Sequence, residues 1–201
     1  LTAKHLMVHS ILEFWPSVAG EVLLGIGFAT PVLGIFNEET ERSVALMPVG
    51  QGVIRWPSNE KSLTTISTES TLPFSDNSVD RILLIHALEL SNDRHQLMEE
   101  VWRVLRPEGR VLFIVPNRRA LWSRAESTPF GQGFPFTFSQ LQRLLRYHHF
   151  LPLRQTATLY FPPMQMRLVL KTVPLWQWIG KHFARPFGGI LIVEAQKNMF
   201  A

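Results

Sequence analysis

The sequence predicts an α/β fold, a sandwich in which helices cover a mostly parallel sheet. Short apolar runs typical of buried strands alternate with segments of helical periodicity along the whole chain. A length of 201 residues fits a single domain with a sizeable core. With 46% apolar and 18% charged residues, the composition excludes disordered and fibrous proteins. We therefore treat residues 1–201 as one domain with about seven strands.

The first half of the chain opens with a helix. Apolar residues at helical spacing from Met7 to Trp15 predict an amphipathic helix within residues 1–17, and Pro16 ends it. Apolar runs bounded by glycine, proline or polar residues then predict buried strands. We expect strands at 22–26, 43–47, 63–66 and 80–87, and a helix that starts within 31–36.

The second half alternates helices and strands more regularly. Ser91 or Asn92 is expected to cap a helix that continues to Leu105, where Pro107 and Gly109 stop it. The spacing of Thr137 and Gln140 is that of a capping box and predicts a further helix start. We expect strands at 110–115, 153–161 and 189–195, and helices at 137–145 and 174–183.

Charge is distributed unequally along the chain. Residues 1–102 carry a net charge of −7, whereas residues 103–201 carry +11. A basic second half favours anionic partners, although a charged face can also serve only solubility. The absence of cysteine excludes disulfides and thiolate sites, and the histidines are not spaced as metal ligands, so we expect no metal. The longest uncharged apolar stretch, 22–37, is too short to span a membrane, and we expect a cytoplasmic protein.

Two stretches resemble the class I S-adenosylmethionine-dependent methyltransferases, of the type 11-like kind. They are LPFSDNSVDRILLIHALE at 72–89 and EVWRVLRPEGRVLFIVP at 100–116. The family has a Leu-Pro-Phe turn before its fourth strand and a turn like Leu-Arg-Pro-Gly-Gly before its fifth. Over residues 18–120, the resemblance implies a Rossmann-like three-layer sandwich with a seven-stranded, mostly parallel sheet and a reversed last strand. It also implies S-adenosyl-L-methionine as cofactor, bound over the ends of the first three strands.

The first motif of that family, an acid followed by alternating glycines, is changed here. In the stretch GIGFATP, Gly25 stands at the position of the acid and Pro31 at that of the last glycine. No acid follows Met47 at the second strand end, where the family has one that binds ribose. The resemblance implies donor contacts from Gly25, Gly27, Ala29, Thr30, Met47, Thr68 and Glu69. The glycine pair alone would also allow a nicotinamide enzyme, but its third glycine and following acid are missing.

Polar residues that follow two later strands are the candidates for substrate contacts. The resemblance places His86 and Glu89 beside the transferred methyl, where His86 could act as a catalytic base or the two side chains could orient the substrate. Asn117 and Arg118 leave the next strand and could hold an anionic acceptor, since guanidinium groups bind carboxylate and phosphate. The structural alternatives are that His86 is a core histidine, that Glu89 is an acid at the start of a helix, and that Asn117 and Arg118 lie in a solvated loop.

Aromatic and basic residues are interleaved in residues 120–185. We expect this region to form a helical, aromatic cap around an apolar acceptor or a contact with a membrane surface, with core packing as the alternative. The leading hypothesis is methyl transfer to a small-molecule or lipid-like acceptor. The alternative is a non-catalytic scaffold of the same fold that binds a protein partner. Signature motifs of RNA-binding modules are missing, so nucleic acid is not an expected partner.

Overall fold

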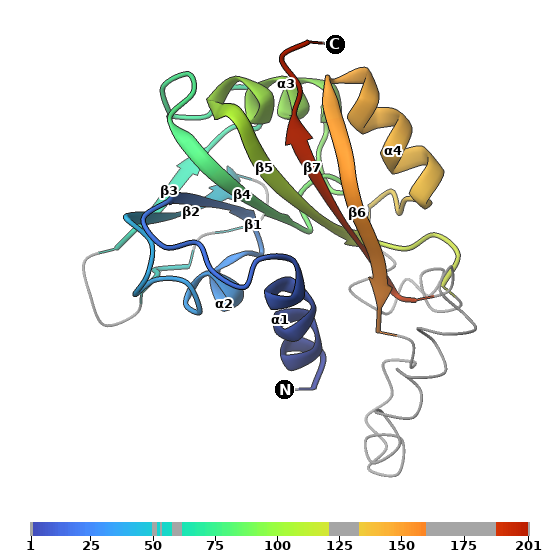
Figure 1. The fold of residues 1–201 in the computed structure, drawn as a ribbon, viewed down its shortest axis with the longest axis horizontal. Coiled ribbons are helices and arrows are strands. Elements are labelled where there is room, and N and C mark those ends of the chain that lie inside the picture. Colours follow the sequence, from blue (N-terminus) through green and yellow to red (C-terminus); the bar gives the residue numbers. More distant parts are fainter. Residues whose placement is uncertain are drawn as a thin grey trace.

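The structure, a computed structural model, describes residues 2–49, 52, 54–57, 62–120, 133–159 and 188–200. Its centre is a seven-stranded sheet of order β3-β2-β1-β4-β5-β7-β6 (Figure 1). The strands are β1 Val22–Gly27, β2 Arg42–Pro48, β3 Thr64–Ser67, β4 Val79–Ile85, β5 Leu105–Pro116, β6 Phe150–Thr158 and β7 Ile190–Lys197. This confirms the predicted α/β class and its strands.

Four described helices cover the two faces of the sheet and make three layers (Figure 1). They are α1 Thr2–Phe14, α2 Thr30–Leu33, α3 Arg94–Val104 and α4 Phe138–Tyr147. Successive side chains of a strand point to opposite faces. Ile82 of β4 accordingly packs in the core cluster that contains α3 and α4, and Leu83 packs in the cluster that contains α1 and α2. In the described chain, no helix is long and apolar enough to cross a membrane.

Strand direction fixes where a ligand can bind. Strands β1 to β5 run parallel, and β7 runs antiparallel to both β5 and β6, which confirms the reversed last strand. The carboxyl ends of β1 to β5 therefore meet at one edge of the sheet. The strand order reverses between β1 and β4, and such a switch point opens a crevice for ligands at that edge.

Several boundaries differ from the sequence prediction, and the strand expected at 153–161 is β6, which starts and ends three residues earlier. Helix α2 is a single turn, with Gly34 as its C-cap. The N-cap of α3 is Asp93 rather than Ser91 or Asn92, and its carboxylate accepts the backbone N–H groups of the next turn. Strand β5 begins at Leu105 instead of 110, because Leu105 pairs with β4 before the following Pro-Glu-Gly segment forms an irregularity in the ladder.

A buried carboxylate joins the first helix to the end of the chain. Glu194 of β7 is fully buried and accepts hydrogen bonds from Trp15 Nε1 at 2.9 Å, Arg154 Nε at 2.8 Å and Arg110 Nη1 at 3.2 Å. Burial raises the pKa of Glu194, but the hydrogen bonds from Arg154 and Trp15 outweigh it and hold the pKa below its ordinary value. The carboxylate therefore connects α1, β5, β6 and β7.

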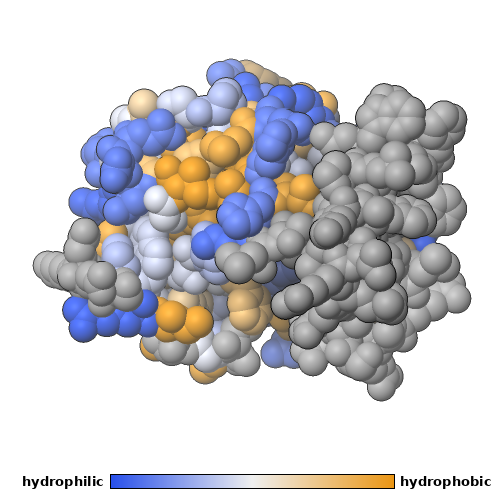
Figure 2. All heavy atoms as spheres, turned by 90° about the horizontal axis from the view of Figure 1, so that it is seen from below, coloured by the Kyte–Doolittle hydropathy of each residue, from blue (hydrophilic) through white to orange (hydrophobic). Residues whose placement is uncertain are grey.

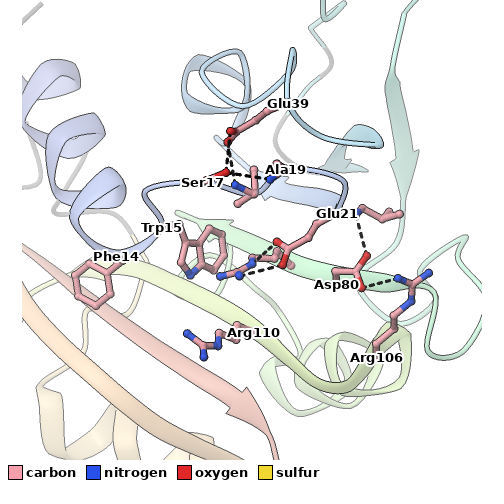
Figure 3. A network of polar contacts seen from close by, with 12 residues as sticks. Phe14, Trp15, Ser17, Ala19, Glu21, Glu39, Asp80, Arg106 and Arg110 are labelled. Atoms are coloured by element: carbon pink, nitrogen blue, oxygen red, sulfur yellow. Dashed lines mark hydrogen bonds and ion pairs between the residues drawn. The ribbon is translucent and has the colours of Figure 1, made fainter.

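Polar contacts also fix the amino ends of β1 and β4, as Figure 3 shows. Asp80 accepts the backbone N–H of Val22 at 2.9 Å and the Arg106 guanidinium at 2.5 Å. Glu21 forms a bidentate pair with Arg81. These contacts hold the strand ends opposite to the edge where a ligand can bind.

Arg103 holds the Leu-Pro-Phe turn against α3. Its guanidinium donates to the carbonyl oxygens of Leu72 and Phe74 and to the carboxylates of Asp76 and Glu100. The Glu100 carboxylate also accepts the Leu72 N–H at 2.7 Å. The hydrogen bond from Arg103 lowers the pKa of Glu100, and burial opposes it. One planar donor group thus satisfies both carbonyl oxygens of the turn.

We expect Arg103→Lys to destabilise the fold by about 2 kcal/mol, because an ammonium cannot reproduce the planar set of donors. Urea unfolding measures this loss. Arg106→Lys is the matched control, since that side chain is half exposed and its ion pair with Asp80 is worth about 0.5 kcal/mol. Equal losses in both variants would show that Arg103 acts only as a surface charge.

Candidate functional site

A cavity of about 990 Å³ lies at the carboxyl edge of the sheet, at the switch point between β1 and β4. Residues that follow four strands line it, together with residues from α1 and from the start of α3. Figure 2 views the molecule from below, the side on which β4 and β5 end, and shows an apolar area bordered by hydrophilic residues. The volume is within the range of sites for small molecules and cofactors.

The third strand end supplies the polar wall of the cavity. Thr68 and Glu69, both expected to contact the donor, line it. Glu69 Oε2 accepts the Ser91 hydroxyl at 2.6 Å and the Asn92 N–H at 3.1 Å. These bonds fix the Glu69 carboxylate between β3 and α3.

The other residues expected to contact the donor lie beneath or beside the cavity wall. Ala29 is fully buried, and Met47 is buried with its sulfur accepting the N–H of Ile54. Neither of them lines the cavity, and neither do Gly25, Gly27 and Thr30. From the first two strand ends, the wall is formed instead by Phe28, Pro31, Val32, Pro48 and Val49.

Packing explains why the first motif lacks its acid at residue 25. A Cβ on Gly25 would lie 2.6 Å from both Ala29 Cβ and Leu33 Cδ1, so no larger side chain fits between β1 and α2. Gly27 has a φ of +80°, and a Cβ there would lie 2.4 Å from the Ile85 carbonyl oxygen. Glycine at both positions therefore allows the close packing around the end of β1, and neither residue contributes a charged group to the turn.

The hollow over this turn is open. Phe28 is 49% exposed and lines the cavity, whereas Met47 is buried and does not line it. Val49, which also lines the cavity, is 64% exposed. Neither Phe28 nor Met47 fills the space that a ligand needs.

His86 and Glu89 form a hydrogen-bonded pair in the cavity wall. His86 follows β4 with a φ of +50°, a left-handed conformation that is uncommon outside glycine. Its Nδ1 lies 2.6 Å from Glu89 Oε1. The Glu89 side chain is only 1% exposed, and Oε2 has no hydrogen-bond partner among the described residues. A buried carboxylate oxygen without a donor is costly, which indicates a group that a ligand or water completes.

Asn117 and Arg118, both expected to contact the substrate, lie in two different places, and neither lines this cavity. Asn117 is buried, its amide donates to the Gly188 carbonyl oxygen at 2.6 Å, and its backbone N–H donates to Gly189. This side chain thus holds the end of β5 against the start of β7, and it does not line the cavity. Arg118 is exposed and lines a second, neighbouring cavity.

Two residues of the first helix are among the contributors to the site that sequence reasoning missed. Lys4 and Met7 of α1 line the cavity, although only the packing of α1 on the sheet brings them there. The helical pattern of this segment identifies its buried face but not its position over the strand ends. Within the described part of the chain, no three His, Asp, Glu or Cys side chains are grouped to hold a metal ion. Most of the expected cap at 120–185, with the helix expected at 174–183, lies outside the described residues.

Comparison with known proteins connects this geometry to a family. Residues 38–113 match the family model of a methyltransferase domain. These residues include β2, β3 and β4, the His86–Glu89 pair and most of β5. No match was found among curated proteins. The resemblance inferred from the Leu-Pro-Phe and Leu-Arg-Pro stretches is confirmed for this part of the chain.

Solved structures extend the likeness to nearly the whole chain. The protein bound to the Haloferax volcanii Trm112 methyltransferase activator is 15% identical, with a TM-score of 0.69 over 96% of this chain and 89% of that one. An S-adenosylmethionine-dependent methyltransferase from Thermotoga maritima is also 15% identical, with a TM-score of 0.66 over 97% and 89%. The cyclase SpnF is 20% identical, with a TM-score of 0.62 over 96% and 80%.

These likenesses define the class of fold, that of the S-adenosylmethionine-dependent methyltransferases. The fold of this class also occurs in a cyclase, so fold alone does not fix the reaction. The activity has to be argued from the cavity and its residues.

Proposed function

We propose that this protein transfers a methyl group from S-adenosylmethionine to an acceptor held beside His86. The observation that carries the proposal is the His86–Glu89 pair, in which Glu89 is buried and which lines the cavity at the strand ends of a methyltransferase fold. The matching family and the methyltransferases of the same fold support this reaction type. The pair supplies a candidate base where an acceptor would lose its proton.

The residues present fit a bound S-adenosylmethionine. The cavity is large enough, it opens next to the glycine turn after β1, and its wall holds the fixed carboxylate of Glu69. Phe28 and Val49 offer apolar surface, and Thr68 and Glu69 offer oxygen atoms for the hydroxyl and amino groups of the cofactor. When bound, the sulfonium supplies an electrophilic methyl group, so the protein contributes chiefly alignment and proton removal.

His86 and Glu89 have complementary roles in this proposal. Glu89 accepts a hydrogen bond from Nδ1–H of the imidazole and fixes the ring, as a carboxylate does when it orients a catalytic histidine. The other ring nitrogen, Nε2, is then the atom that takes a proton from the acceptor. Because Glu89 is buried, its charge acts on the ring with little screening by water.

Calorimetric titration with S-adenosylhomocysteine tests donor binding directly. We expect the wild type to bind with a dissociation constant below about 1 mM, weaker than in a site with acids at all three strand ends. Val49→Trp should fill the cavity and weaken binding at least about tenfold. Ile66→Trp, a change at another exposed aliphatic residue, on β3 and outside the cavity wall, should leave the affinity unchanged.

An absence of binding at millimolar ligand to the folded wild type would overturn the enzymatic proposal. The non-catalytic scaffold would then be the better account of this fold. Equal effects of the two tryptophan variants would place the donor outside this cavity.

A further inference from the structure

A second cavity, of about 890 Å³, lies beside the first. It is enclosed by the start of α3, the segment before α4 and the outer face of α4. Asn92 and Asp93 line both cavities, so the two spaces adjoin at the N-terminus of α3. Its wall is rich in guanidinium groups and rings, from Arg94, Arg118, Arg143, Phe134, Phe136 and Tyr147.

The charge of this second cavity is positive. Three arginines line it against one carboxylate, Asp93, which already accepts two backbone N–H groups as the N-cap of α3. Neither Arg94 nor Arg143 takes part in the ion pairs found among the described residues. The guanidinium groups of Arg94 and Arg143, which line one cavity, therefore offer a site for an anion.

The arginine side of this cavity is held in place by aromatic packing. The Arg94 guanidinium lies 4.6 Å from the centroid of Phe134 and 5.5 Å from that of Phe136. Such cation–π contacts restrain the guanidinium beside the two rings. Phe134 is 65% exposed, so its ring also offers apolar surface to a ligand.

Backbone contacts tie the second cavity to the His86–Glu89 pair. The Phe134 N–H donates to the Glu89 carbonyl oxygen at 2.9 Å, and the Arg118 N–H donates to Phe136 at 2.9 Å. Gly133 lies so close to Glu89 that a Cβ there would be 2.4 Å from the same carbonyl oxygen. A group bound against Phe134 therefore lies at a fixed distance from the proposed methyl-transfer site.

We propose that the second cavity holds the anionic group of the methyl acceptor. The acceptor is then a small organic anion, with a carboxylate or phosphate ester at one end and an apolar or aromatic body that reaches toward His86. A small molecule fits better than a polyanion, because the arginines line a concave space of ligand size with rings in its wall. This assignment rests on the proposed methyl transfer for the acceptor's role, but binding of the anion can be measured independently.

Fluorine NMR titration of the full chain with 4-fluorobenzoate and 4-fluorophenyl phosphate tests the site. We expect both anions to bind, and neutral 4-fluorobenzamide to bind at least about tenfold more weakly. The comparison of the two anions shows which headgroup the arginines prefer. Arg94→Gln and Arg143→Gln should each weaken the anions about tenfold, and Arg146→Gln, an exposed arginine of α4 outside the cavity wall, should not.

Two results would overturn the anion site. One is binding of 4-fluorobenzamide as tight as that of 4-fluorobenzoate, and the other is an affinity within about twofold of wild type in the Arg94→Gln, Arg143→Gln double variant. Heparin binding that depends on Arg146 as much as on Arg143 would identify an extended basic surface instead. Calorimetry with S-adenosylhomocysteine on the same variants separates the two proposals, since the loss of arginines should leave donor affinity unchanged.

Discussion

Glu89→Gln should lower methyl transfer by about a hundredfold or more and leave the affinity for S-adenosylhomocysteine unchanged. The amide is neutral and can turn its NH₂ toward Nδ1, so it no longer stabilises a protonated imidazole. His86→Ala should cause a comparable loss. The measurement is transfer of label from radioactive S-adenosylmethionine to a small-molecule extract or to the acceptor identified from it.

Glu99→Gln is the matched control for this experiment, because Glu99 is an exposed carboxylate on α3, the helix that follows Glu89 in the chain. It should keep wild-type transfer. Transfer within about twofold of wild type in folded Glu89→Gln would remove the pair from the reaction. Loss of donor affinity in the same variant would assign Glu89 to the cofactor rather than to the acceptor.

Glu194→Ala should destabilise the protein by about 3–5 kcal/mol, which makes it the largest expected effect on folding. The substitution leaves Arg110, Arg154 and the Trp15 indole N–H without their shared acceptor at the junction of α1 with β5, β6 and β7. Denaturant unfolding at neutral pH measures the loss. Glu108→Ala, an exposed carboxylate on β5, should change stability by less than about 0.5 kcal/mol.

The Glu194 carboxylate should also make the free energy of unfolding depend on pH. Its pKa in the folded state is lower than the ordinary value of 4.5, so its contribution is complete above that value. The contribution is lost as the pH falls through the folded-state pKa. Glu194→Gln should remove this part of the acid dependence, and an unchanged pH profile in that variant would show that the ion pairs do not stabilise the fold.

The strands and the helix starts followed from local sequence patterns. The apolar run at Val22–Ile26 and the capping box of Thr137 and Gln140 correspond closely to β1 and α4. Such features depend on residues that are close together in the chain, so a single sequence is enough to predict them. The N-cap of α3 could not be identified from the sequence, because Ser91, Asn92 and Asp93 are all good capping residues. In the structure, the Ser91 hydroxyl donates to Glu69, and Asp93 is the N-cap.

The site was only partly predictable. His86, Glu89, Thr68 and Glu69 follow strands in the sequence, and the sheet brings them to one cavity. The burial of Asn117 against Gly188 is a contact between residues far apart in the chain, and the same is true of Arg94 with Phe134. The steric exclusion of a side chain at Gly25 likewise depends on how α2 packs. These contacts depend on tertiary packing, which the periodicity of the sequence does not predict.

Backbone hydrogen bonds hold the residues that follow β5 and β6 against the residues that precede β7. Leu159 accepts the N–H of Gly189, and Gly189 accepts that of Asn117, so the chain leaves β6 and enters β7 at one fixed point. The pairing of β5, β6 and β7 at this end of the sheet therefore depends on hydrogen bonds among the described residues, and a substitution that keeps these bonds should leave the three strand ends together.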